Sequence, residues 1–105
     1  MFNKRSGHHS IITGDEGNRF ESITMSTKPG GNHIKNHRRV KHKRNIKFDK
    51  NPEVNGIGDS YMEITLRRFP IRTYVKDHKK FVFIQSDKDK IDKLAKEKHK
   101  FKLWH

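Results

Sequence analysis

The sequence predicts an α+β protein, mainly β, in which a small antiparallel sheet curls into a barrel and carries one C-terminal helix. Two observations predict this class: segments rich in β-branched and aromatic residues alternate with glycine-rich turns, and one amphipathic helical segment follows them. A chain of 105 residues has room for one modest core, so residues 1–105 are expected to form a single domain.

The first element expected is a β-hairpin. Residues 8–13 favour a strand, residues 14–18 are dense in turn formers, and residues 19–27 are again rich in β-branched and aromatic types. The pattern then breaks, because Pro29 has no backbone donor for a strand ladder and two glycines follow it. A long connection is therefore expected to begin at residue 28.

Residues 28–50 are the most basic part of the chain, with nine Lys and Arg against one acid, Asp49. No helical or alternating apolar face survives this density of charge, so residues 28–45 are predicted to be a basic, flexible loop. Only residues 45–48 have a strand-like alternation, which predicts a short strand before a turn at Asn51.

The second half of the chain predicts more strands and then the helix. Residues 60–66 alternate apolar and polar, which is typical of a half-buried strand; residues 67–70 interrupt it and residues 71–75 resume it. Residues 81–84 are a continuous apolar run, which predicts a strand buried on both faces. Residues 86–101 place their few apolar side chains on one face of a helix.

The net charge points to a polyanionic partner. Twenty-five Lys and Arg against twelve Asp and Glu leave +13, more than solubility requires. The chain has no apolar run long enough for a membrane span and no amphipathic anchor, so no membrane partner is expected. The absence of cysteine fits a reducing compartment, and the N-terminus lacks the apolar stretch of a signal peptide, so a cytoplasmic location is expected.

The basic stretch is the strongest indication of nucleic-acid binding, since closely spaced cations can neutralise several phosphates at once. Tyr61 is the aromatic side chain expected to be exposed for base stacking. The residues expected to contact nucleic acid are Lys28, Lys35, Arg38, Arg39, Lys41, Lys43, Arg44 and Tyr61. The competing interpretation is that residues 28–45 only connect two strands.

Histidines supply the candidate proton-transfer groups. His8 and His9 begin a predicted strand, where neighbours point to opposite faces, so at most one is expected to face a given site. His33 and His37 are four residues apart and His42 follows, but with no cysteine or second carboxylate nearby no metal site is predicted.

The opening of the chain resembles that of the MazF/PemK and ToxN type toxin ribonucleases. The similarity lies in residues 4–8 before a strand, residues 23–29 at a strand end, residues 59–61 before a strand, and the helix start at residues 86–87. The resemblance implies an SH3-like barrel and RNA cleavage that needs no metal or cofactor.

The same resemblance implies which residues act at the site. It makes Arg5 the cation that stabilises charge on the phosphate, Ser26 or Thr27 the hydroxyl at the scissile phosphate, and Ser60 a possible third contributor. The base would be His8 or His9. An antitoxin is then a possible partner.

Three functions remain open on the sequence alone, and the oligomeric state is not predicted. The first is an RNA-binding protein that cuts RNA as a toxin-type endoribonuclease. The second is an accessory protein that binds nucleic acid, RNA more readily than DNA, without cutting it. The third is a basic protein that binds an acidic protein partner.

Overall fold

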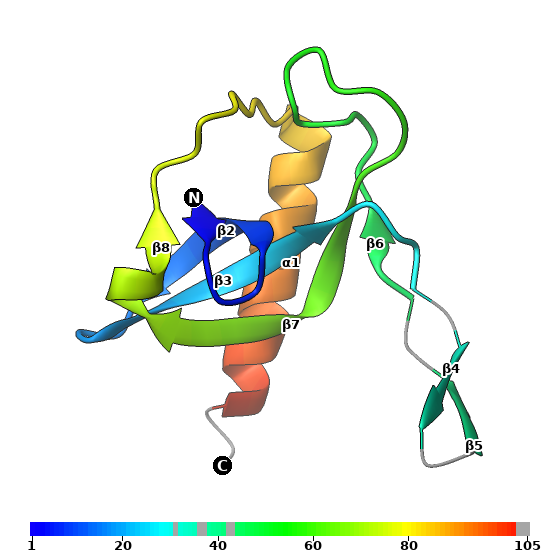
Figure 1. Ribbon diagram of the computed structural model, residues 1–105, viewed down its shortest axis with the longest axis horizontal. Coiled ribbons are helices and arrows are strands. Elements are labelled where there is room, and N and C mark those ends of the chain that lie inside the picture. The colour runs from blue at the N-terminus through cyan, green and yellow to red at the C-terminus, as the bar shows by residue number, and fades with distance from the viewer. Residues whose placement is uncertain (31, 36–37, 42–43, 103–105) are drawn as a thin grey trace.

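The computed structural model describes the backbone of residues 1–30, 32–35, 38–41 and 44–102, and the side chains of residues 1–30 and 44–99. Its main feature is an antiparallel six-stranded sheet with the strand order β6-β7-β3-β2-β1-β8 (Figure 1). The strands are β1 (Phe2–Asn3), β2 (His8–Asp15), β3 (Arg19–Ser26), β6 (Ile46–Lys47), β7 (Tyr61–Pro70) and β8 (Tyr74–Val75). One helix, α1 (Gln85–Lys102), follows, so the α+β, mainly β prediction is confirmed.

The predicted first hairpin is present as β2 and β3, which pair from Ser10–Thr24 to Asp15–Phe20. Gly17 has a φ of 90° in the turn between them, a backbone angle that glycine adopts without steric cost. The partner of β3 on its other side is β7, with Ile23 opposite Leu66. β3 is thus the central strand, and five consecutive residues of it, from Glu21 to Met25, are buried.

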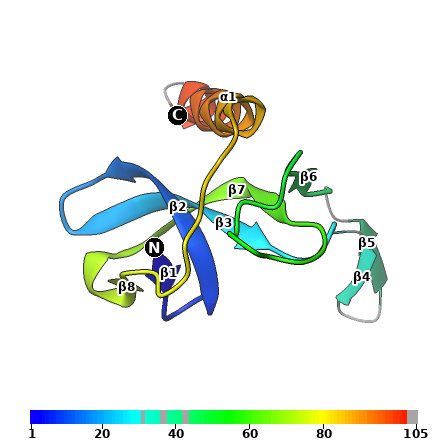
Figure 2. The same cartoon turned by 90° about the horizontal axis from the view of Figure 1, so that it is seen from above.

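The sheet curls over one of its faces but is not closed. Tyr74 on the edge strand β8 donates to or accepts from Ser22 on β3, with 2.7 Å between the hydroxyl oxygens, although β2 and β1 lie between these strands in the sheet order. Its ring also packs on Phe20 and Phe69, at 5.4 and 6.4 Å between centroids. Figure 2 shows this curl, with β1 and β8 on the side of the sheet opposite α1.

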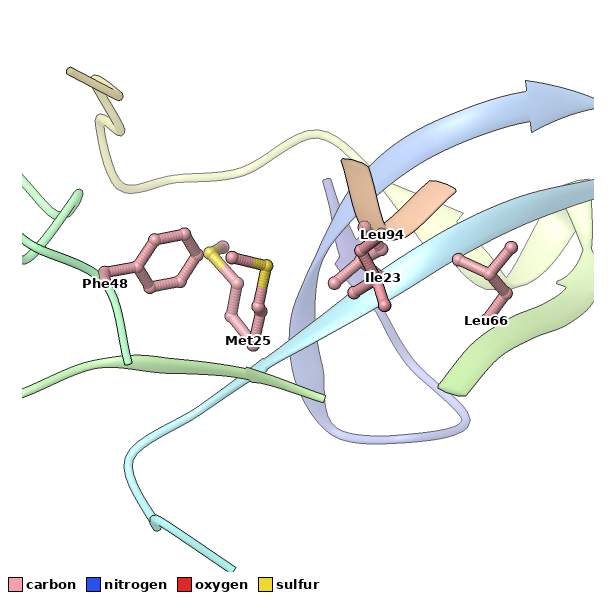
Figure 3. Packing of buried hydrophobic residues seen from close by; sticks show 6 residues of the cluster. Ile23, Met25, Phe48, Leu66 and Leu94 are labelled. Atoms are coloured by element: carbon pink, nitrogen blue, oxygen red, sulfur yellow. The ribbon is translucent and has the colours of Figure 1, made fainter. Parts of the chain in front are cut away.

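The main core lies between the sheet and α1. Leu94 of the helix, 4% exposed, packs on Ile23, and Leu66 and Met25 extend the same cluster along the sheet (Figure 3). Phe48, just after β6, closes the far end of the cluster beside Met25. Within the described residues, no helix is long and apolar enough to cross a membrane.

Residues 28–45 were predicted to be a loop without strands, but the structure contains two strands there. Backbone pairing forms a separate hairpin of β4 (Asn32–Lys35) and β5 (Arg38–Lys41), and it projects beyond β6 in Figure 1. Ladder hydrogen bonds between two short segments do not require an apolar face, which is why the charge pattern did not reveal this hairpin. The short strand expected at residues 45–48 is confirmed as β6.

Of three predictions for residues 67–84, two were wrong, and the strand expected at residues 71–75 is confirmed only at Tyr74–Val75. β7 runs without interruption through Pro70, whose missing donor is tolerated at the last residue of a strand. Residues Ile71–Thr73 form a 3₁₀ turn, η1, before the two-residue strand β8. The apolar run 81–84 is no strand: Phe81 makes one isolated bridge to Glu53, and Val82 and Ile84 are exposed.

Candidate active site and nucleic-acid interface

A cleft of about 230 Å³ opens where the start of β2, the end of β3 and the loop of residues 51–60 meet. Its lining includes Gly7, His8, His9, Ser26, Thr27, Asn51, Glu53, Ile57, Asp59, Ser60, Lys79 and Phe81. These residues come from four separate segments of the chain, so the fold brings together side chains that are far apart in sequence. Five of the six residues predicted for catalysis line it: His8, His9, Ser26, Thr27 and Ser60.

The loop of residues 51–60 forms one wall of the cleft and is held by its own polar groups. The Asn51 side chain accepts from the Glu53 backbone N–H at 3.0 Å and donates to the Gly58 carbonyl at 3.1 Å. A β-carbon at Gly56 would lie 2.9 Å from Glu53 and Asn51 atoms, so this tight turn requires glycine. The loop is therefore a compact unit that presents Asp59 and Ser60 to the cleft.

The helix anchors the chain that enters this loop. Asp87, buried in the first turn of α1, accepts the backbone N–H groups of Asp49 and Lys50 at 2.8 and 3.2 Å. Lys90, one turn further along, donates to the Asp49 carboxylate at 2.6 Å. The start of this loop is thus tied to the helix by a buried carboxylate, which favours a fixed geometry.

A histidine–carboxylate pair, His9 with Asp77, lies beside the cleft. The Nδ1 atom of His9 lies 2.7 Å from the Asp77 Oδ1 atom, and each side chain is 19% exposed. β1 creates this pair, because Phe2 of β1 pairs with His9 on one side and with Val75, two residues before Asp77, on the other. The second oxygen of Asp77 accepts from the Met1 ammonium at 2.9 Å.

The charge state of Asp77 fixes the tautomer of His9. Burial raises the pKa of Asp77. Hydrogen bonds from the Met1 ammonium and His9, together with their charges, lower it by more than burial raises it, so the pKa of Asp77 lies below its ordinary value. An ionised carboxylate only accepts hydrogen bonds, so Nδ1 of His9 carries the proton. When His9 is neutral, its Nε2 atom then has a free lone pair and can act as a base.

The rings around His9 hold its imidazole in place. Phe81 lies 4.8 Å from it and Phe2 lies 5.2 Å from it, measured between ring centroids. His8 is exposed, and no hydrogen bond involves its ring among the described residues. Both histidines border the cleft because it reaches the very start of β2, contrary to the expectation that at most one would face a site. Only His9 is oriented by a carboxylate.

The predicted hydroxyl residues come from the end of β3 and from the loop of residues 51–60. Ser26 is the last residue of β3 and sits opposite Tyr61 in the β3–β7 pairing. Its Oγ atom accepts the Lys28 backbone N–H at 3.1 Å, which turns the chain away from the sheet. Thr27 is exposed and Ser60 is half-buried, so hydroxyl groups from two elements border the cleft.

The cations are arranged differently from the prediction. Arg5 is exposed in the turn between β1 and β2, and it is not among the described residues that line the cleft. Lys79 does line it, and its Nζ atom lies 3.2 Å from the Glu53 carboxylate at a largely exposed position. The Lys or Arg found among the described lining residues is therefore one that the sequence did not single out.

The residues predicted to contact nucleic acid are divided between the end of the sheet and the hairpin. Lys28 and Arg44 are exposed, whereas Tyr61 is half-buried between Ser26 and Lys47 of the neighbouring strands, so it is not the freely exposed aromatic expected. Lys35 pairs with Arg38, and Arg39 and Lys41 follow on β5. The prediction for Lys43 falls outside the described residues.

No group of three or more potential metal ligands occurs in the part of the chain whose side chains are described. The side chains of His33, His37 and His42 lie outside that part.

Sequence reasoning missed two residues of the site: Lys79, which lines the cleft, and Asp77, which binds His9. Both lie between the strands that the sequence predicted at residues 71–75 and 81–84. Asp77 is 68 positions from His9, so only the placement of β1 between β2 and β8 reveals the pair. The one available signal was the concentration of charge at residues 76–80.

Comparison of this chain with models of protein families, with curated proteins and with solved structures finds no match.

Proposed function

We propose that this protein binds RNA in the cytoplasm and cuts it in the cleft beside His9. The single observation that carries the proposal is the gathering of His9, oriented by Asp77, with the hydroxyl residues Ser26, Thr27 and Ser60 around one cleft. The net charge of +13 supports a polyanionic substrate. RNA is favoured over DNA because its 2′-hydroxyl can serve as the nucleophile, so cleavage requires no metal or cofactor.

The proposed reaction uses groups of this chain only. His9 Nε2 takes the proton of the 2′-hydroxyl, and the 2′-oxygen forms a bond to phosphorus. The bond from phosphorus to the 5′-oxygen breaks, and that oxygen leaves with a proton from an acid or from water. Lys79 stabilises the charge that develops on the phosphate, the role that the resemblance gave to Arg5. The nearly fully exposed Ile57 offers an apolar surface for a base at the rim.

A relationship to the MazF/PemK and ToxN type ribonucleases, with their SH3-like barrel and antitoxin partners, is part of this proposal. It is supported by the curl of the sheet and by the position of Ser26 at the end of β3, where the resemblance requires a hydroxyl residue. An antitoxin would then be an acidic protein that covers the cleft or the basic surface.

The second candidate function is binding without cleavage. It is favoured by the position of Arg5, which lies outside the lining of the cleft instead of among the other candidate catalytic residues. The cations of the β4–β5 hairpin would serve this function as well as the first.

The test uses a long RNA incubated with the purified protein in the presence of EDTA, with His9→Gln and His8→Gln compared as a matched pair. We expect the wild type to give products with 2′,3′-cyclic phosphate and 5′-hydroxyl ends. His9→Gln is expected to cut about 10²- to 10⁴-fold more slowly while still binding, because it lacks the general base. His8→Gln should cut nearly as fast as the wild type.

Unchanged cutting by His9→Gln would remove this mechanism. RNA that is shifted on a gel but never cut by the wild type would select binding without cleavage. Failure to bind RNA, together with co-purification of an acidic protein, would favour the third function expected from the sequence.

A further inference from the structure

Two backbone segments that meet at the edge of the sheet carry four exposed cations, although the two pairs are at least 67 positions apart in sequence. Lys4 and Arg5 belong to the turn between β1 and β2, and Arg72 and Lys76 flank β8. The backbone joins the two segments directly: the Lys4 N–H donates to the Thr73 carbonyl at 2.8 Å, and Asn3 pairs with Tyr74. The Asn3 side chain also donates to the Thr73 hydroxyl. We call these four residues the edge cations.

The edge cations lack the acidic partners found elsewhere in the described part of the chain. There, none of the four takes part in a salt bridge, and residues 1–8 and 70–76 contain no Asp or Glu. Arg67 and Arg68, in contrast, each bind a glutamate. Asp77, the nearest acid in sequence, is already bound to His9 and the Met1 ammonium. Four uncompensated charges repel one another, so a bound polyanion would relieve that repulsion.

We propose that Lys4, Arg5, Arg72 and Lys76 bind the phosphates of a single RNA strand and lead it into the cleft. The same turn that carries Lys4 and Arg5 continues into Gly7, His8 and His9, which line the cleft. A strand bound to these cations would therefore reach His9 without crossing the sheet. This inference rests on the proposed function and adds a binding surface that the basic segment 28–50 does not include.

The surface suits phosphates better than an acidic protein. A stable protein interface has an apolar, well-buried centre, whereas the chain around the edge cations exposes only Val75 and Met1 as large apolar side chains among its described residues. Phosphate binding needs charge and hydrogen-bond donors with little apolar area. Arg5 and Arg72 can each donate two parallel hydrogen bonds to one phosphate.

The test compares two variants that remove equal charge. The edge variant carries Lys4→Gln, Arg5→Gln, Arg72→Gln and Lys76→Gln. The matched variant carries Lys88→Gln, Lys93→Gln, Lys96→Gln and Lys98→Gln on α1, where no described residue forms a salt bridge with these lysines. Each variant lowers the net charge by four, from +13 to +9. The affinity for a fluorescent single-stranded RNA is measured by anisotropy between 50 and 300 mM salt.

We expect the edge variant to bind about tenfold or more weakly than the helix variant. Its log–log salt dependence should be shallower than that of the wild type by about 3, since each lost phosphate contact on a single strand removes about 0.7. Equal weakening in both variants would overturn the edge site while leaving the proposed function intact. A wild type that binds no RNA would overturn both.

A second measurement does not depend on the folding of a fourfold variant. A 4-thiouridine RNA is photocrosslinked to the wild-type protein and the attached peptides are identified. Crosslinks within residues 1–8 and 71–80 support the edge site, whereas crosslinks confined to residues 85–102 contradict it. Tighter binding of poly-glutamate than of RNA of equal charge at this surface would show that an acidic protein is the occupant.

Discussion

Two histidine–carboxylate pairs of nearly equal length occur in different surroundings in this molecule. His9 and Asp77 lie 2.7 Å apart beside the cleft, and His99 of α1 lies 2.6 Å from Glu21 of β3 under the helix. The Glu21 carboxylate also accepts from Thr13 at 2.9 Å and from Arg68 at 2.8 Å, and the residue is 2% exposed. Asp77, by comparison, has no contact with a Lys or Arg among the described side chains.

The surroundings of each histidine–carboxylate pair, and not the pair itself, determine whether it stabilises the fold or serves the cleft. Three side chains surround the Glu21 carboxylate, and Glu21 and His99 are absent from the described lining of the cleft, so this pair joins the helix to the sheet. His9 borders a cleft with hydroxyl residues, and its partner leaves Nε2 as the group available for proton transfer. We therefore expect the Glu21 pair to control stability and the Asp77 pair to control activity.

The largest expected effect comes from breaking the buried network. Glu21→Ala removes the buried acceptor shared by Thr13, Arg68 and His99, although Arg68 keeps Glu16 as a second partner at 3.2 Å, so it should lower the free energy of unfolding by about 2–3 kcal/mol. Urea unfolding at pH 7 followed by circular dichroism measures this loss. Glu21→Gln, which keeps the shape and one acceptor oxygen, should recover part of it.

Asp77→Ala provides the comparison on the cleft side. Its partners are partly exposed, so the loss of stability should be closer to about 1 kcal/mol. Equal losses in the free energy of unfolding for Glu21→Ala and Asp77→Ala would show that the two pairs stabilise the fold equally, and would contradict the distinction between them.

How far the sequence predicts this molecule depends on whether the signal is local. The β2–β3 hairpin and α1 follow from turn formers and apolar spacing within short windows, and both are present. The apolar run 81–84 misled for the same reason: Phe81 and Phe83 do pack against the core, but as an extended connection held by the Val82 N–H to the Pro52 carbonyl. A local apolar pattern reports burial of side chains and does not report strand pairing.

The residues of the candidate site could be indicated from the sequence, but their geometry could not. The resemblance indicated Ser26, Thr27 and Ser60, and histidines at a strand start indicated His8 and His9; all five line one cleft. The pairing of His9 with Asp77 requires β1 to lie between β2 and β8, and that order depends on contacts across the whole chain. The edge cations depend on the same strand, because Lys4 meets Thr73 only there.

The next effect concerns activity and assumes that RNA cleavage is found. Asp77→Asn removes the charge that holds the proton on Nδ1 of His9, while an amide oxygen of nearly the same shape remains. We expect Asp77→Asn to lower kcat by about ten- to a hundredfold with little change in KM, because Asp77 is a positioning residue and does not contact RNA. Single-turnover cleavage measured from pH 5 to 8 should also show a displaced pH profile.

A merely structural role of Asp77 would give a different result. In that case Asp77→Asn would lower the amount of folded protein and leave the pH profile of the remaining activity unchanged. Glu21→Gln serves as the control, since it alters the other pair and should leave the pH profile of cleavage in place.

The smallest expected effect is on the pH dependence of stability. Burial raises the pKa of Glu21. Hydrogen bonds from His99 and Thr13 and the charges of His99 and Arg68 lower it by more than burial raises it, so the pKa of Glu21 in the folded protein lies below the ordinary value. The pKa of Asp77 is lowered in the same way by the Met1 ammonium and His9. For a carboxylate with a lowered pKa, the stabilisation is complete above the unfolded pKa of about 4 and is lost as the pH falls through the folded pKa.

Replacing either carboxylate by its amide therefore removes a source of acid sensitivity. Urea unfolding at pH 6, 5, 4 and 3 should show that the wild type loses more stability on acidification than Glu21→Gln or Asp77→Asn, although both variants start from a lower value at pH 6. The flattening should be the greater in Glu21→Gln, because Glu21 is the more deeply buried of the two and has the larger number of charged or polar partners. Parallel curves of stability against pH for the wild type and the variants would mean that neither carboxylate changes its protonation on unfolding, and the electrostatic distinction between the two pairs would be lost.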